Sequence, residues 1–250
     1  MIWSKSQLQT YKQCPQRFYL ENFTKQVGDT SPQIQLTRGT TFHKTAELLY
    51  GKIDFGELHR MGSEDQIKDY LRGLMPNDED PYLNDLYDNF AIEEADRWTR
   101  TKQAKELDAD RYFKPIFSEV EVVNEKRSIR GKIDWIFRAF DDEYVIGEIK
   151  TGKEYEISEI RKELCFLVLL VEDTELLDKT PKYIMCYYPR TNQVIFEEPK
   201  PQSFAALWRM YEYGQKGLAS KDFHKEIGFL CGFCPFMDPC LTEEELASLD

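Results

Sequence analysis

The 250-residue sequence contains no run of uncharged apolar residues long enough to cross a bilayer, so no membrane association is expected. Its first residues, MIWSKSQLQTYKQC, carry no apolar segment behind their charges, so no secretory signal is expected and a cytoplasmic location is the default. Internal repeats and low-complexity linkers are also absent. Basic residues are few relative to acidic ones, and the net charge of −12 argues against a broad nucleic-acid-binding surface.

The acidic excess is concentrated in two stretches, however. Residues 76–96 carry eight acids and no base, and residues 243–245 with Asp250 add four more. These acids equal the whole net charge, so the remainder is balanced overall and locally basic, as in KSQLQTYKQCPQRF and EKRSIRGK. We expect the acidic stretches to be solvated faces, which leaves room for a basic groove elsewhere.

With 41% hydrophobic residues the chain can bury a sizeable core, and its apolar pattern changes near residue 115 from helical to alternating. Helices are expected from Ser4 or Ser6, after Gly39 with Thr40 or Thr41 as cap, and at about 65–75 and 83–108. The second half predicts strands at 116–123, 128–140, 143–150, 182–189 and 193–198, and helices at 157–173 and about 202–218. This order predicts an α/β fold with a central mixed sheet flanked by helices and a helical insertion before it.

Carboxylates fall on two neighbouring predicted strands. GKIDWI carries Asp134, and VIGEIKTG carries Glu148 with Lys150 on the same face. Two converging carboxylates can bind Mg²⁺ or Mn²⁺, because hard cations prefer oxygen ligands. Lys150 could then orient an attacking water and offset charge on a phosphate. Taken alone, this pattern is weak and occurs in many soluble sheets, where structural salt bridges are its more common role.

A third carboxylate is available on the preceding strand. Glu119 and Glu121 share one face, and a hairpin about residues 126–128 lets either lie opposite Asp134, depending on the strand register. Lys132 shares the face of Asp134 and could contact backbone phosphates, although a solvated surface charge is the more common role of such a lysine.

Cysteines cluster near the end of the chain, at Cys231, Cys234 and Cys240. A Cys-x2-Cys spacing lets two thiolates reach one metal centre, and cytosolic thiols remain reduced, so metal or cluster ligation is expected. Three thiolates do not complete a four-coordinate site. A fourth ligand must therefore come from elsewhere in the chain.

Several motifs occur together in a recognisable order. They are S-x-S-x-L-x-x-Y-x-x-C-P from Ser4 to Pro15, G-T-T-F-H from Gly39 to His43, the G-K-I-D and G-E-I-K strands, and the closing C-x2-C-x5-C. In this combination the chain resembles a RecB-like nuclease of the PD-(D/E)xK superfamily. It is most similar to the iron-sulfur branch, which includes CRISPR-associated adaptation nucleases and the AddB nuclease domain. The resemblance spans almost the whole chain and implies a restriction-endonuclease-like core.

The resemblance also implies a fourth cysteine ligand. In the iron-sulfur branch one cysteine comes from the N-terminal helix, so Cys14 is expected to join the C-terminal trio around a 4Fe-4S cluster. Such a cluster would join the two chain ends, as a long-range crosslink does. The alternatives are a zinc site on the same four cysteines and three thiols that share no ligand. Cys165 and Cys186 lie in apolar patterns and are expected in the core.

For the active site, the resemblance implies that His43, Asp134, Glu148 and the main-chain carbonyl of Ile149 bind Mg²⁺ or Mn²⁺. Asp134, Glu148 and Lys150 would be the catalytic residues, with Glu119, Glu121, Lys132 and Glu163 as auxiliary candidates. Related nucleases carry Gln and, four residues later, Tyr on the following helix. Here Glu163 and Leu167 take those positions, so weaker DNA binding and lower processivity are expected.

We therefore predict one nuclease domain over residues 1–250. Its parts are an N-terminal helix with the first cysteine (1–25), a helical part (39–110), the nuclease core (111–220) and a cluster-binding tail (221–250). The expected function is a metal-dependent DNA nuclease, an exonuclease of CRISPR adaptation or of DNA recombination and repair. DNA would be its substrate, and CRISPR integration proteins or a helicase its partners. The alternative is a noncatalytic iron-sulfur DNA-binding or assembly subunit of a helicase or integration complex.

Overall fold

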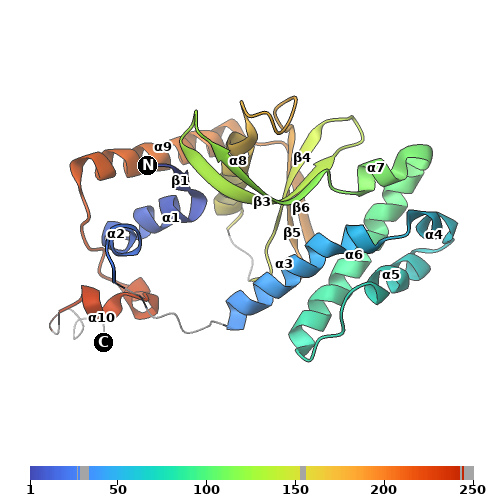
Figure 1. Cartoon of the computed structure of the whole chain (residues 1–250), viewed down its shortest axis with the longest axis horizontal. Helices are drawn as coiled ribbons and strands as arrows, with labels where there is room; N and C mark the ends of the chain where they lie inside the picture. Colours follow the sequence, from blue (N-terminus) through green and yellow to red (C-terminus); the bar gives the residue numbers. More distant parts are fainter. Residues whose placement is uncertain (27, 29–33, 153–155, 243, 245–250) are drawn as a thin grey trace.

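The computed structural model describes residues 1–26, 28, 34–152, 156–242 and 244. A mixed six-stranded sheet forms the centre, with helices on both faces (Figure 1). Its strands are β1 (Trp3–Ser4), β2 (Phe117–Asn124), β3 (Ile129–Arg138), β4 (Tyr144–Ile149), β5 (Tyr183–Tyr188) and β6 (Gln193–Glu197). The predicted α/β class and the flanked mixed sheet are confirmed, in a form consistent with a restriction-endonuclease-like fold.

The helices fall into an N-terminal pair, a helical insertion and a C-terminal set. They are α1 (Lys5–Gln13), α2 (Pro15–Phe23), α3 (Ile34–Lys52), α4 (Phe55–Arg60), α5 (Glu64–Gly73), α6 (Pro81–Lys105), α7 (Ala109–Phe113), α8 (Ile157–Val171), α9 (Pro201–Ser220) and α10 (Met237–Cys240). Short 3-10 helices η1 (Glu106–Asp108) and η2 (Phe229–Phe233) complete the set. Among the helices of the described residues, none combines the length and apolar composition that a membrane span requires.

Strand β3 organises the sheet. Along one edge β2 pairs with it in antiparallel fashion, from Phe117↔Ile136 to Asn124↔Ile129. The other edge has two neighbours, because β1 pairs in parallel with Ile129 and Arg130 whereas β4 pairs with the segment from Trp135 to Arg138. Asp134 therefore lies where the neighbour of β3 changes from β1 to β4.

Two apolar cores cover the two faces of the sheet. One core joins the sheet to α1, α8 and α9, and the other joins it to the helical insertion from α3 to α7. In Figure 1 the insertion lies at one end of the molecule, while α1 and α2 lie at the other end with α9 and α10. Both cores contain strand residues, so the sheet is held from both sides.

The expectation of one N-terminal helix over residues 1–25 is wrong, because the structure has two helices that meet at Cys14. Ser4 caps α1 with Gln7 in a capping box, as the sequence indicated. Cys14 then adopts an extended conformation, with φ −159° and ψ 104°. Pro15 explains the break, since the residue before a proline avoids the helical region and proline favours the first turn of a helix.

The expected start of the second helix after Gly39 is also wrong. Helix α3 begins at Ile34 and continues through Gly39, and Thr40 donates its hydroxyl to the carbonyl of Leu36 instead of capping. The glycine permits a close approach, because a Cβ at this position would lie 3.1 Å from Oγ1 of Thr151. The insertion thus packs directly against the loop that follows β4. Helix α4 was not expected.

Part of the acidic stretch at 76–96 is not a solvated face. Glu94 is buried, and its carboxylate lies 2.7 Å from the guanidinium of Arg97. At the start of α6, Asp80 pairs with Arg38 of α3 at 2.6 Å. These carboxylates hold the insertion together, which the count of acids alone did not indicate. Most of the acidic tail lies outside the described residues.

Candidate functional site

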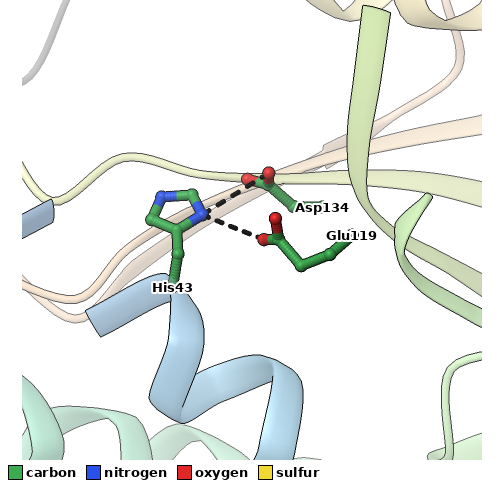
Figure 2. A group of neighbouring side chains, drawn as sticks. All are labelled: His43, Glu119 and Asp134. Carbon is green, nitrogen blue, oxygen red and sulfur yellow. Dashed lines mark hydrogen bonds and ion pairs between the residues drawn. The ribbon is translucent and has the colours of Figure 1, made fainter. Parts of the chain in front are cut away.

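Three potential metal ligands meet at the junction of α3 with β2 and β3. They are His43, Glu119 and Asp134, and one ligand atom of each lies within 4.8 Å of the others. Nδ1 of His43 is 3.3 Å from Oε1 of Glu119 and 3.5 Å from Oδ1 of Asp134. Figure 2 shows the imidazole reaching from the helix toward the two carboxylates. We call these residues the carboxylate-histidine group.

The register of β2 and β3 selects Glu119 over Glu121. Glu119 falls between the pairs Ser118↔Trp135 and Val120↔Ile133, directly opposite Asp134, whereas Glu121 pairs with Lys132. Glu119 has a φ of 52°, an uncommon value for a residue with a side chain. Backbone strain of this kind gathers at functional sites, and here it occurs at a proposed metal ligand.

Charge holds the group together. Burial lowers the pKa of His43, but its hydrogen bonds to Asp134 and Glu119 outweigh that effect and raise the pKa to about 10. A protonated imidazole cannot ligate a cation, so His43 would release this proton on binding one. The ammonium of Lys132 also pairs with Glu119. Cations thus already surround the two carboxylates, as expected of a site built to accept positive charge.

A second cluster lies on neighbouring elements and contains Glu148, Lys150, Glu163 and Lys5. Lys150 Nζ is 2.7 Å from Oε1 of Glu148 and also pairs with Oε1 of Glu163. Lys5 Nζ is 3.1 Å from the same oxygen of Glu148 and pairs with the same oxygen of Glu163. Two ammoniums and two carboxylates therefore alternate in a closed arrangement, which we call the charge ring.

The charge ring lies mostly out of solvent. Burial opposes ionisation of Lys150 and Lys5, but the negative charges of Glu148 and Glu163 raise the pKa of both lysines above their usual range. Both lysines are thus charged around neutral pH. Ile149, between Glu148 and Lys150, links the ring to the first group, because its main-chain N–H donates to Oδ2 of Asp134 at 2.7 Å.

The donor set fits a divalent cation. Carboxylates with one imidazole suit Mg²⁺ or Mn²⁺. In addition, Oε2 of Glu148 is buried and has no hydrogen-bond partner among the described residues, although buried carboxylate oxygens are normally paired. Of the predicted ligands, the structure brings His43 and Asp134 together and adds Glu119. The carboxylate of Glu148 lies outside that group and faces the lysines.

The four predicted cluster cysteines line one small cavity of about 20 Å³, bordered also by Arg17 and Lys225. Cys14 sits at the start of α2, where its sulfur accepts the N–H of Arg17. Burial and the neighbouring cysteine sulfurs raise the pKa of Cys240, while Lys225 acts in the opposite direction. Their sulfurs do not form a group within 4.8 Å in the described part of the chain.

Phe236 and Phe233, which lie on either side of Cys234, differ in burial. Phe236 is buried, and Gly28 approaches so closely that a Cβ there would lie 2.8 Å from Pro235. Phe233 is 69% exposed and contacts Phe229. Cys165 and Cys186 are fully buried in the core beside α8, as predicted.

Several other predicted residues lie away from the site or pack in the core. Glu121 is exposed, and Leu167 is buried in the apolar core. Glu163 does contact Lys150, as the sequence allowed. The sequence analysis did not predict a site role for Lys5, because its only distinguishing feature in the sequence is its position between the two motif serines. The pairing of β1 with β3 is what reveals that it lies near Glu148.

The family comparison agrees with this geometry. Residues 2–241 match the family described as the PD-(D/E)XK nuclease superfamily, nearly the whole chain. A comparison with curated proteins gives no significant match. Nucleases of this superfamily typically use divalent metals.

Proposed function

Because the chain belongs to the PD-(D/E)XK nuclease superfamily, we propose that it is a divalent-metal-dependent nuclease that hydrolyses phosphodiester bonds of DNA. The observation that carries this proposal is the convergence of His43, Glu119 and Asp134 beside the charge ring of Glu148 and Lys150. Carboxylates, an imidazole and a lysine in one place are the groups that this hydrolysis requires.

His43, Asp134, Glu148 and the carbonyl of Ile149 would hold Mg²⁺ or Mn²⁺, with Glu119 as a further oxygen ligand. When bound, the cation supplies Lewis-acid stabilisation of the charge that develops on the phosphate. Asp134 is already oriented by the N–H of Ile149, so it requires little reorganisation. The orphaned oxygen of Glu148 is the atom that we assign to the metal.

Lys150 would act on the reacting atoms themselves. Its pKa is raised, so it is a poor general base at neutral pH and a persistent positive charge. We therefore assign it to orienting the attacking water and stabilising negative charge on the phosphate oxygens. Lys132, which is half-exposed and pairs with Glu119, is placed to contact a neighbouring backbone phosphate.

Cleavage of end-labelled single- and double-stranded DNA with Mg²⁺ or Mn²⁺, beside metal-free binding of the same DNA, tests the activity. The parent should cut with metal and stop when a chelator is added. A parent that binds DNA but cuts neither substrate with either metal would favour the noncatalytic binding or assembly subunit. Following the products from each labelled end distinguishes an exonuclease, which shortens DNA progressively, from an endonuclease.

A 4Fe-4S cluster on Cys14, Cys231, Cys234 and Cys240 is the second part of the proposal. The four cysteines line a common cavity, and main-chain bonds already hold the chain ends together there, such as Gln16 N–H to the His224 carbonyl at 3.0 Å. Zn–S bonds of about 2.3 Å would draw sulfurs to roughly 4 Å from one another. A zinc ion on the same four cysteines is the alternative, and the iron, sulfide and zinc contents of the purified protein separate the two.

A biological role in CRISPR adaptation or in DNA recombination and repair follows from the motif resemblance and stays part of the proposal. Products distinguish the two roles. Trimming of overhangs to a defined length fits preparation of DNA for integration, whereas extended processive digestion alongside a helicase fits repair. The replaced Gln and Tyr positions, Glu163 and Leu167, lead us to expect low processivity from the isolated chain.

A further inference from the structure

Lys5 brings a second ammonium into the charge ring from a distant part of the sequence. It is the first residue of α1 and follows β1, which pairs with the edge of β3 that β4 also uses. Its Nζ contacts the same carboxylate oxygens of Glu148 and Glu163 that Lys150 contacts. The N-terminus therefore supplies half of the positive charge in the ring.

Charge balance explains what this second ammonium does. Without Lys5, the carboxylates of Glu148 and Glu163 would face Lys150 alone, and Lys150 would be held between them. Moving it toward a phosphate would then leave two adjacent carboxylates unpaired in a mostly buried place, which is strongly unfavourable. With Lys5 present, Glu163 keeps a partner when Lys150 moves away. Lys5 is also the more accessible lysine, with 28% of its side chain exposed against 18%.

We propose that Lys5 is a positioning residue of the nuclease centre. It neutralises Glu163, so that Lys150 can turn to the reacting phosphate while Glu148 binds the divalent cation. This inference rests on the proposed nuclease function, and it assigns to α1 a direct part in the active site. Lys5 itself touches neither the metal nor the scissile bond.

Removing the charge tests this assignment. At saturating DNA and Mn²⁺, Lys5→Ala should cleave end-labelled DNA about tenfold or more slowly in single turnovers, with little change in DNA affinity. Its Mn²⁺ affinity, titrated without DNA, should rise about twofold or more, because a positive charge near the metal has been removed. A general loss of structure would instead weaken both.

Lys12→Ala is the matched control. Lys12 lies on the same helix and also pairs with a glutamate of α8, Glu159 at 3.8 Å, but its side chain is half exposed. This variant loses the same charge at a comparable place in the sequence. It should cut DNA and bind Mn²⁺ like the parent.

Neutralising Glu163 provides the decisive comparison. In the Lys5→Ala background, Glu163→Gln removes the surplus carboxylate, so the double variant should recover most of the lost rate and the parental Mn²⁺ affinity. Lys5→Arg should retain most of the rate as well. Parental cutting by Lys5→Ala, or a double variant no faster than Lys5→Ala, would overturn the role of Lys5.

The same titrations separate this inference from the function on which it rests. A parent that cuts no DNA overturns the proposed nuclease, and Lys5 is then judged by Mn²⁺ binding alone. An affinity that is unchanged or weaker in Lys5→Ala would show that Lys5 does not balance charge at the metal site. A tighter affinity that Glu163→Gln reverses would support the arrangement even in a noncatalytic chain.

Discussion

The two candidate sites are built on very different supports. The nuclease centre takes its ligands from β2, β3, β4 and α3, whose positions follow from strand register and from cores on both faces of the sheet. The cysteine cavity is lined by Cys14 at the start of α2, Cys231 of η2, Cys234 just after η2 and Cys240 of α10, and η2 and α10 contain no buried residue.

This difference in packing predicts different roles for the divalent cation and for a group bound by the cysteines. Glu119 and Asp134 are held in place by the sheet, so removing a divalent cation should stop chemistry but leave the fold. The C-terminal segment with three of the cysteines has little packing in η2 and α10, whereas Cys14 lies between two helices that contribute to the core. A metal or cluster bound there would contribute directly to folding, because it would supply stabilisation that the C-terminal segment does not obtain from a hydrophobic core.

The largest expected effect on cleavage comes from removing a metal ligand of the site on the sheet. Asp134→Ala should lower cleavage by at least about 1,000-fold and weaken Mn²⁺ binding, because it removes an oxygen ligand that the Ile149 N–H orients. Its iron content and melting temperature should stay close to parental values. Asp141→Ala is the control, since that carboxylate lies in the turn between β3 and β4 and pairs with Lys182. An Asp134→Ala protein that still cuts would remove the proposed centre.

The next effect concerns the cysteine cavity. Protein purified without oxygen should contain iron and acid-labile sulfide, and Cys14→Ser should lose both and melt roughly 5 °C or more lower, since the link between the chain ends is lost. Cys165→Ala is the contrast, because it leaves a small cavity in the core but should keep the iron. Stoichiometric zinc in the parent, or a full cluster in Cys14→Ser, would contradict the cluster or the assignment of Cys14.

The smallest effect sharpens the register within the nuclease centre. Glu119→Gln should weaken Mn²⁺ binding about tenfold, because a neutral amide is a poorer ligand than a carboxylate. Glu121→Gln, two residues along the same strand but exposed and opposite Lys132, should bind Mn²⁺ normally. Isothermal titration of both variants measures the difference. Equal effects would mean that β2 is registered differently on β3.

Of the strands in the described residues, β2 to β6 could be predicted from the sequence, because apolar residues alternate along a half-buried strand, whereas β1 was not expected. The strand containing Asp134 and the strand containing Glu148 were both expected, with boundaries close to those observed. The choice between Glu119 and Glu121 could not be made, since a two-residue shift of strand register keeps every side chain on the same face of the sheet. Only the observed pairing decides it.

The two errors at the helix ends have different causes, one local and one long-range. Pro15 carried the signal that ends α1 at Cys14, and the expected single helix overlooked it. Gly39 was interpreted as a helix boundary, but it permits close contact with Thr151, a residue more than one hundred positions away. A contact between residues so far apart in the sequence cannot be predicted from the pattern of neighbouring residues. The same is true of Lys5, whose partners lie on β4 and α8.

Single-turnover cleavage by Lys150→Ala tests most directly whether the sheet-borne site performs chemistry while the cysteine site serves structure. The variant should bind DNA within a few-fold of the parent and keep its full iron content, yet cut at least ~100-fold more slowly in Mg²⁺ or Mn²⁺. One phosphate-facing charge contributes little to total DNA affinity but much to the transition state. Cutting by Lys150→Ala at the parental rate would contradict the catalytic assignment.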